Sequence, residues 1–189
     1  ELDRLNLTDN TLVILTSDNG PVLDDGYQDQ AEKLVGSHKP AGPYRGWKTM
    51  RYAGGTCIPF IVRWPGVVEP GVSDAFVCQM DLLASLASLV GQSYPDRTDS
   101  QNTLQTFLGK NRKGRNELVI EGMLDYAYRQ GDWVMIPPYP GENRTYELYN
   151  IRKDPEQKND LSESEPKVLR RMMMRFEELK RETGKKTNF

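Results

Sequence analysis

An Asp-Asn pair is the first feature of this sequence whose residue types and spacing could do chemistry. Asp18 and Asn19 follow an apolar run over residues 12–15, after Thr16 and Ser17, and precede Gly20. Hard cations such as Ca²⁺ and Mg²⁺ prefer oxygen ligands, and this pair supplies two of them with a single negative charge. The triplet is equally typical of a turn, because Asp, Asn and Gly all tolerate unusual backbone angles. The local pattern leaves both interpretations open.

The second candidate is Lys48, which closes the glycine-punctuated segment Gly42-Pro-Tyr-Arg-Gly-Trp-Lys48. A lysine or arginine near a bound metal would neutralise an anionic group of a substrate, and Lys48 could act there as a point charge. Arg45 competes less well for that role. The alternative is that Lys48 is a solvated lysine on a surface loop.

Two apolar strands are expected to position these residues. The unbroken run from Leu12 to Leu15 predicts a strand covered on both faces, as in parallel sheets flanked by helices, and residues 58–64 predict a similar one. In such sheets the functional crevice lies beyond the carboxyl ends of the strands, where Asp18 and Asn19 would project. The long loop over 20–46, with a short helix predicted at 28–34, is of a length that is usually functional.

The remaining chain predicts a helix and then a change of pattern. A helix is expected to begin near Ser73 or Asp74 and to end before Gly91. A boundary falls near residues 109–115, and short strands follow at 118–120, 127–128, 132–136 and 146–151. The helix that closes the chain carries the apolar stripe Val168, Met172, Phe176 and Leu179.

These patterns together predict an α/β fold with two parts. Residues 1–110 should form a partial parallel or mixed sheet with flanking helices. Residues 111–189 should form a small terminal subdomain, an antiparallel sheet with a closing helix.

Composition excludes several function classes. The formal net charge is −2, with 25 basic and 27 acidic residues interspersed, so there is no basic stripe for nucleic acid and no polybasic membrane anchor. No apolar run approaches the ~20 residues that span a bilayer, and no signal segment opens the chain. Cys57 and Cys78 show neither a metal-ligand spacing nor a disulfide framework.

The order of the short motifs adds a family resemblance. The chain contains, in order, Ser-Asp-Asn-Gly-Pro at 17–21, Arg-Gly-x-Lys at 45–48, Gly-Gly-x-x-x-Pro at 54–59 and Arg-Trp-Pro-Gly at 63–66. This order resembles the carboxyl-terminal part of the sulfatase family, in the alkaline-phosphatase superfamily. The stretches 129–133, 147–150 and 154–161 resemble that family's terminal sheet and its exit, so nearly the whole chain is covered.

The resemblance implies roles for individual residues. Asp18 and Asn19 would be ligands of an active-site Ca²⁺, and Lys48 would be the catalytic lysine that contacts the sulfate group. His38, the only histidine, does not align with the family's general-acid histidine; we expect it to touch substrate from the long loop, and an exposed loop histidine is the open alternative. Arg45 is expected to contact substrate because of its charge and its place in the glycine-punctuated loop. The implied activity is hydrolysis of a sulfate ester on a sulfated sugar or an aryl compound, and the implied location is periplasmic or secreted.

The family's nucleophile is not matched by the residues that most resemble it. Sulfatases of this type convert the Cys or Ser of Cys/Ser-x-Pro-x-Arg into formylglycine. Cys57-Ile-Pro-Phe-Ile61 has Ile61 where the arginine is needed, so Cys57 is interpreted as structural. We expect the formylglycine and the remaining metal ligands upstream, outside this sequence.

This sequence alone is therefore expected to be an inactive fragment. Its partner would be the missing amino-terminal portion of the same polypeptide, or a second copy joined through exposed strand edges. Two alternatives stay open: a phosphodiesterase or phosphonate hydrolase of the same superfamily, which would share the Asp-Asn pair, and a non-catalytic binding module built on the terminal lobe.

Overall fold

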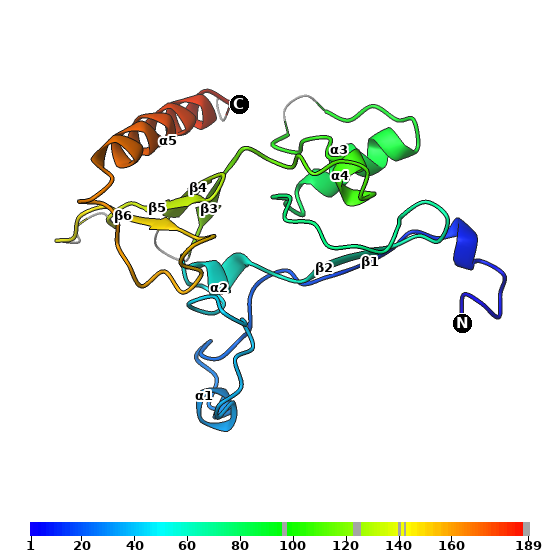
Figure 1. Ribbon diagram of the computed structural model, residues 1–189, viewed down its shortest axis with the longest axis horizontal. Helices are drawn as coiled ribbons and strands as arrows, with labels where there is room; N and C mark the ends of the chain where they lie inside the picture. The colour runs from blue at the N-terminus through cyan, green and yellow to red at the C-terminus, as the bar shows by residue number, and fades with distance from the viewer. Residues whose placement is uncertain (96–97, 123–125, 140, 142, 187–189) are drawn as a thin grey trace. The chain divides into compact units, whose positions relative to one another are not determined.

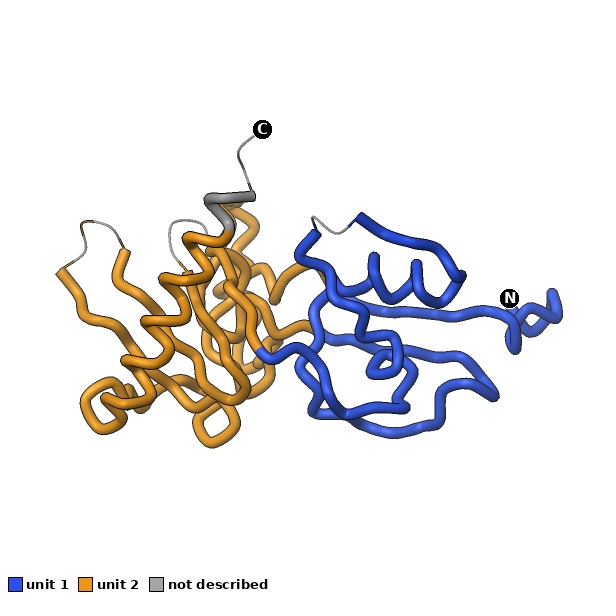
Figure 2. Tube along the Cα trace, turned by 90° about the horizontal axis from the view of Figure 1, so that it is seen from above, with its two compact units in different colours: residues 1–16, 59–116 blue, residues 17–58, 117–189 orange. Residues whose placement is uncertain are grey.

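The computed structural model describes residues 1–95, 98–122, 126–139, 141 and 143–186. The chain divides into two compact units, residues 1–16 with 59–116 and residues 17–58 with 117–189 (Figure 2). The second unit joins the long loop and Lys48 to the terminal sheet. The domain boundary predicted at residues 110 and 111 stays a prediction. No helix among the described residues is long and apolar enough to cross a membrane.

The first unit is built on a two-stranded antiparallel sheet. Strand β1 (Val13–Thr16) pairs with β2 (Phe60–Arg63), with Leu15 opposite Ile61. The two strands predicted from the apolar runs are thus present, and their pairing is antiparallel. A 3-10 turn, η1 (Thr8–Asn10), precedes β1.

The expectation that both strands are covered on both faces is wrong for the described residues. Leu15 and Ile61 share one face of the sheet and are 57% and 58% exposed. The opposite face carries Phe60, whose ring stacks on that of Phe107 with centroids 5.1 Å apart. An apolar run therefore did not distinguish a doubly covered strand from one with an open apolar face.

The helices of this unit are α3 (Asp81–Leu89) and α4 (Leu104–Phe107). The first begins seven to eight residues later than predicted. It buries Asp81, Ala84 and Ser85, while Leu83 is 52% exposed. The fully buried Asp81 carboxylate accepts a hydrogen bond from Arg115 Nη2 at 2.8 Å. This pairing compensates the burial of both charges.

The second unit contains a four-stranded antiparallel meander, as predicted (Figure 1). The strands follow the chain order β3-β4-β5-β6. Gly131 adopts a positive φ of 57° in the two-residue connection between the second and third of them, where such hairpins require it. The strands are β3 (Glu117–Glu121), β4 (Tyr126–Gln130), β5 (Trp133–Ile136) and β6 (Glu147–Asn150).

Helix α5 (Pro166–Lys186) covers one face of this sheet. Proline suits the first turn of a helix, because its missing N–H would have no partner there. Met172 and Phe176 pack on Tyr128, and Val168 and Leu179 flank them, which confirms the predicted apolar stripe.

The other face of the sheet is covered by the loop segment that carries the candidate site. Side chains alternate along each strand, so Val134 and Ile136 point away from α5 and pack with Ala53 and Tyr52. Ala53 begins α2 (Ala53–Thr56), and the predicted short helix in the loop is α1 (Ala31–Leu34). The terminal sheet is thus the platform on which the loop rests.

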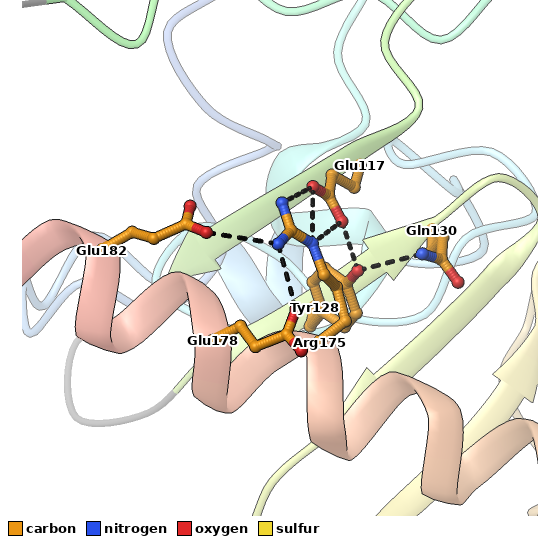
Figure 3. A network of polar contacts seen from close by, with 6 residues as sticks. All are labelled: Glu117, Tyr128, Gln130, Arg175, Glu178 and Glu182. Carbon is orange, nitrogen blue, oxygen red and sulfur yellow. Dashed lines mark hydrogen bonds and ion pairs between the residues drawn. The ribbon is translucent and has the colours of Figure 1, made fainter.

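A charged network joins α5 to the edge strand β3 (Figure 3). The Arg175 guanidinium donates to both carboxylate oxygens of Glu117, the shortest bond being 2.7 Å, and also contacts Glu178 and Glu182. The hydroxyl of Tyr128 donates to Glu117 at 2.6 Å. The hydrogen bond from Arg175 is the largest of the effects that hold the pKa of the Glu117 carboxyl below its usual range.

This lowered pKa predicts a pH dependence of stability. The unfolded Glu117 has a pKa of about 4.3, so its contribution is fully present above about pH 5 and is lost as pH falls through the lower folded pKa. We expect Glu117→Gln to lower the free energy of unfolding at pH 7 and to approach the wild type below about pH 4. Chemical denaturation as a function of pH measures this difference. Glu121→Gln, an exposed carboxylate on the same strand, is the control, and an equal effect there would contradict the assignment.

Candidate functional site

The Asp-Asn pair lies in a bend that follows β1. Ser17 Oγ donates to the Asn19 carbonyl at 2.9 Å, and Asn19 Nδ2 donates to the Gly20 carbonyl at 2.8 Å. The amide nitrogen of Asn19 is thereby committed, which leaves Oδ1 as its ligand atom. Asp18 is exposed, and its carboxylate has no hydrogen-bond partner among the described residues. The turn interpretation and the ligand interpretation are therefore compatible with one geometry.

Backbone hydrogen bonds bring this bend to the loop that carries Lys48. Gly20 N donates to the Gly55 carbonyl at 2.8 Å, and Lys48 N donates to the Pro21 carbonyl at 2.9 Å. Gly54 N donates in turn to the Arg45 carbonyl at 2.7 Å. The three motifs, whose hydrogen-bonded residues lie up to 35 positions apart in the sequence (Gly20 to Gly55), thus form one hydrogen-bonded scaffold.

The backbone segments of the scaffold can approach this closely only because the residues at their points of contact are glycines. A Cβ on Gly20 would overlap the carbonyl oxygen of Gly54. A Cβ on Gly54 would overlap the carbonyl oxygens of Gly46 and Arg45. These contacts involve backbone atoms, which cannot turn aside as a flexible side chain could.

Gln157 ties this scaffold to the terminal sheet, and the sequence did not reveal it. Its side chain is fully buried, and its Oε1 accepts a hydrogen bond from Ala53 N at 2.8 Å, at the start of α2. Its backbone carbonyl accepts one from Arg45 Nη1 at 3.0 Å. Gln157 therefore positions both the glycine pair and Arg45, although it is 104 positions from Ala53 in the sequence.

The loop around Gln157 is shaped by Asp154. The Asp154 Oδ2 atom accepts hydrogen bonds from the backbone N–H groups of Lys158 and Asn159, at 2.9 and 2.8 Å. This tight loop places Gln157 at a positive φ of 47°, a conformation that costs a non-glycine residue free energy. The Asp-Pro-Glu stretch was predicted as the exit of the terminal sheet, and its positioning contact is a feature that one sequence does not show.

The Tyr52 ring packs against Arg45, and Glu147 holds the hydroxyl of that ring. The Tyr52 hydroxyl donates to Glu147 Oε2 at 3.3 Å, and Tyr149 donates to the same oxygen at 2.7 Å. Burial, followed by the hydrogen bond to Glu147, raises the pKa of Tyr149, so this phenol stays a donor. The Arg45 guanidinium lies over the Tyr52 ring, 3.7 Å from its centroid.

Of the predicted substrate contacts, the structure brings two together. His38 and Arg45 line one pocket of about 400 Å³, together with Lys39, Glu156 and Lys158. Lys48 does not line this pocket, and neither do the two predicted metal ligands. Its side chain is half-buried, and its ammonium has no ion-pair partner among the described residues.

The predicted Ca²⁺ ligands fit the ion in type but not in number. Asp18 and Asn19 offer only oxygen atoms, as a hard cation requires, yet Ca²⁺ takes six to eight such ligands. Among the described residues, no group of three or more His, Cys, Asp or Glu side chains could hold a metal. The pair is therefore at most one side of a metal site.

The structure bears on the nucleophile as well. Cys57 is half-buried, and burial raises the pKa of its thiol, which suits the structural role predicted for it. A Ser-x-Pro-x-Arg pattern that sequence reasoning missed occurs at Ser93 to Arg97. Its last two residues lie outside the described residues.

Replacing a crossing glycine tests the scaffold. We expect Gly54→Ala to lower the free energy of unfolding by about 2 kcal/mol or more, because the added methyl group overlaps two backbone carbonyls. Gly71→Ala is the matched control, since a Cβ at Gly71 meets nothing within 4 Å. Denaturant unfolding of both variants measures the difference. Similar stability of the two variants would contradict the close approach.

Truncating Gln157 tests the positioning contact. Gln157→Ala leaves the buried Ala53 N–H without an acceptor, which costs about 1–3 kcal/mol. We expect faster hydrogen exchange at the amides of Ala53 and Gly54 as well as lower stability. Unchanged exchange at these amides would show that Gln157 does not hold the loop.

Comparisons with known proteins agree with this arrangement of motifs. The sulfatase family model matches residues 1–92. The N-acetylgalactosamine-6-O-sulfatase of Bacteroides thetaiotaomicron is 42% identical over 194 residues, which is 95% of this chain and 38% of that protein. Human arylsulfatase A is 33% identical over 115 residues, 60% of this chain and 21% of its own length.

Solved structures show the same fold. A structure from work on glycosaminoglycan metabolism by Bacteroides thetaiotaomicron is 42% identical, with a TM-score of 0.86 over 95% of this chain and 40% of that one. A Pseudoalteromonas sulfatase, 23% identical, has a TM-score of 0.78 over 99% of this chain and 40% of its own. The chain thus spans about two fifths of these proteins. It belongs to the sulfatase family, and it corresponds to a carboxyl-terminal portion of that family's proteins.

Proposed function

We propose that this chain is one portion of an enzyme that hydrolyses sulfate esters and that it supplies one side of the active site. The observation that carries the proposal is the scaffold that joins the Asp18-Asn19-Gly20 bend to the Lys48 loop through backbone hydrogen bonds. Two oxygen ligands and a cation held on one rigid scaffold suit an anionic ester group.

Asp18 and Asn19 would hold part of a Ca²⁺ shell, and Lys48 would contact the sulfate. A bound Ca²⁺ would supply Lewis-acid stabilisation of charge on the sulfate oxygens. The Lys48 ammonium would donate to one of these oxygens and orient the ester. The Pro21 carbonyl, which accepts from Lys48 N, would fix the start of that side chain beside the metal ligands.

The rest of the site would come from further residues of the same polypeptide. The apolar face that carries Leu15 and Ile61 is of a kind that another part of a protein usually covers. We infer that residues 1–189 alone are inactive, and that the nucleophile and the remaining Ca²⁺ ligands lie outside them. We further propose that the intact enzyme acts in the periplasm or outside the cell.

The substrate would be a sulfated sugar or an aryl sulfate. The name of the 42% identical relative makes 6-O-sulfated N-acetylgalactosamine the first substrate to test. A phosphodiesterase or phosphonate hydrolase with the same Asp-Asn pair is the alternative reaction. Matched sulfate and phosphate esters distinguish them, and equal turnover of both by the intact polypeptide would count against a sulfatase.

Substitution of the proposed site residues in the intact polypeptide tests their roles. We expect Asp18→Ala and Lys48→Ala each to lower kcat/KM for the sulfate ester by about a hundredfold or more, because each removes a charge that stabilises the transition state. Because Asp18 is exposed, Asp18→Ala should leave the unfolding free energy nearly unchanged. Steady-state kinetics and denaturant unfolding provide the two readouts.

Ser93→Ala is the control for this experiment. Ser93 is exposed and has no role in the proposed site, so its loss should leave kcat/KM unchanged. Loss of activity in Ser93→Ala would place the nucleophile within this chain and overturn the proposed division of the site. Loss of stability in Asp18→Ala would instead make that residue structural.

A further inference from the structure

The pocket lined by His38 and Arg45 has a chemistry that the roles proposed above do not use. It measures about 400 Å³ and gathers three permanent cations, Lys39, Arg45 and Lys158, around a single carboxylate, Glu156. Glu156 lies 2.5 Å from Lys158 Nζ and 4.0 Å from Lys39 Nζ. One negative charge is thus shared by two lysines, and the pocket keeps an excess of positive charge.

The cations differ in how firmly they are held. Arg45 is fixed between the Tyr52 ring and the Gln157 carbonyl, whereas the side chains of Lys39 and Lys158 are 75% and 69% exposed. The hydrogen bond from Lys158 holds the pKa of Glu156 below its usual range, so this carboxylate stays ionised near neutral pH. An incoming anion would therefore meet one oriented guanidinium and two ammonium groups that can turn toward it.

The walls of the pocket suit a sugar ring. Pro21, Pro40 and Pro43 line it together with Tyr44. Prolines hold their φ angles fixed, and Tyr44 packs on the core of the terminal sheet, so this wall is ordered before a ligand arrives. Apolar walls with a few polar groups are the usual composition of a small-ligand site.

The pocket adjoins the Lys48 loop through two residues. Pro21 lines the pocket, and its carbonyl accepts the hydrogen bond from Lys48 N at 2.9 Å. Arg45 lines the pocket three residues before Lys48. A substrate whose sulfate reaches Lys48 would therefore extend its neighbouring sugar along this wall.

We propose that this pocket is a second anion-recognition subsite, which binds a carboxylate or sulfate group on the sugar next to the one that carries the scissile sulfate. Lys39 and Lys158 contact this anion, and Arg45 orients it. The inference rests on the proposed sulfatase function for the identity of the neighbouring sugar. It goes beyond that function because it adds a charge requirement away from the scissile group.

Binding of disaccharides that lack the scissile 6-sulfate to the intact polypeptide tests the subsite independently of turnover. The probes are N-acetylgalactosamine linked to a uronic acid, the same disaccharide with the carboxylate reduced to an alcohol, and a third with a sulfate on that neighbouring sugar. By calorimetry we expect the wild type to bind the two charged probes about three- to tenfold more tightly than the neutral one. The stronger of the two charged probes identifies the anion.

A matched pair of variants assigns the preference to the pocket. Lys39→Gln combined with Lys158→Gln should abolish the preference for charged probes. Lys33→Gln combined with Lys153→Gln removes the same charge from two exposed lysines that do not line the pocket, and should retain the preference. Equal binding of charged and neutral probes by the wild type, or an equal loss in the control, would overturn the subsite.

Kinetics separate this inference from the proposed function. If the 6-sulfated disaccharides are hydrolysed with the same KM whether the neighbouring sugar is charged or neutral, the subsite is wrong while the sulfatase stands. If no sulfate ester is hydrolysed but the wild type still prefers the charged probes, the sulfatase proposal fails and the subsite stands.

Discussion

The hydrogen bond from Gly20 N to the Gly55 carbonyl is the interaction on which the rest of the site depends. It requires two backbone segments to approach with no side chain between them, and Gly54 meets Arg45 and Gly46 under the same condition. A backbone contact of this kind sets positions to within a narrow range, because neither partner can change rotamer. The Asp-Asn bend and the Lys48 loop therefore move as one body.

The terminal sheet gives this body its support. Val134 and Ile136 pack under Ala53, while the other face of the sheet packs on α5, so the sheet has few ways to shift without opening one of two cores. Gln157 adds a directional contact from the loop after β6. The terminal sheet and the loop after β6, which carry none of the proposed catalytic groups, thus determine the position of the Asp-Asn bend and the Lys48 loop.

The sequence predicted the elements better than their surroundings. The four terminal strands and the stripe of α5 were found because alternation and helical period are local signals. The open face at Leu15 and Ile61 was missed. An apolar run shows that its residues favour burial, but it does not show which segment, if any, covers each face. Gln157 was missed for a related reason. Its contact with Ala53 spans 104 residues, and nothing near either residue indicates the other.

Rigid groups and exposed groups have separate tasks in this site. Gly20, Gly54 and Gln157 are buried and make backbone contacts, whereas Asp18, His38 and Arg45 are exposed. A change at a buried position would disturb the Asp-Asn bend and the Lys48 loop together, because the backbone hydrogen bonds of the scaffold join them. A change at Lys39 or Lys158 would alter the charge of the pocket wall and leave the scaffold intact, because their side chains reach into solvent. Substrate preference can therefore vary through the pocket lysines while the groups proposed to act on the ester keep their positions.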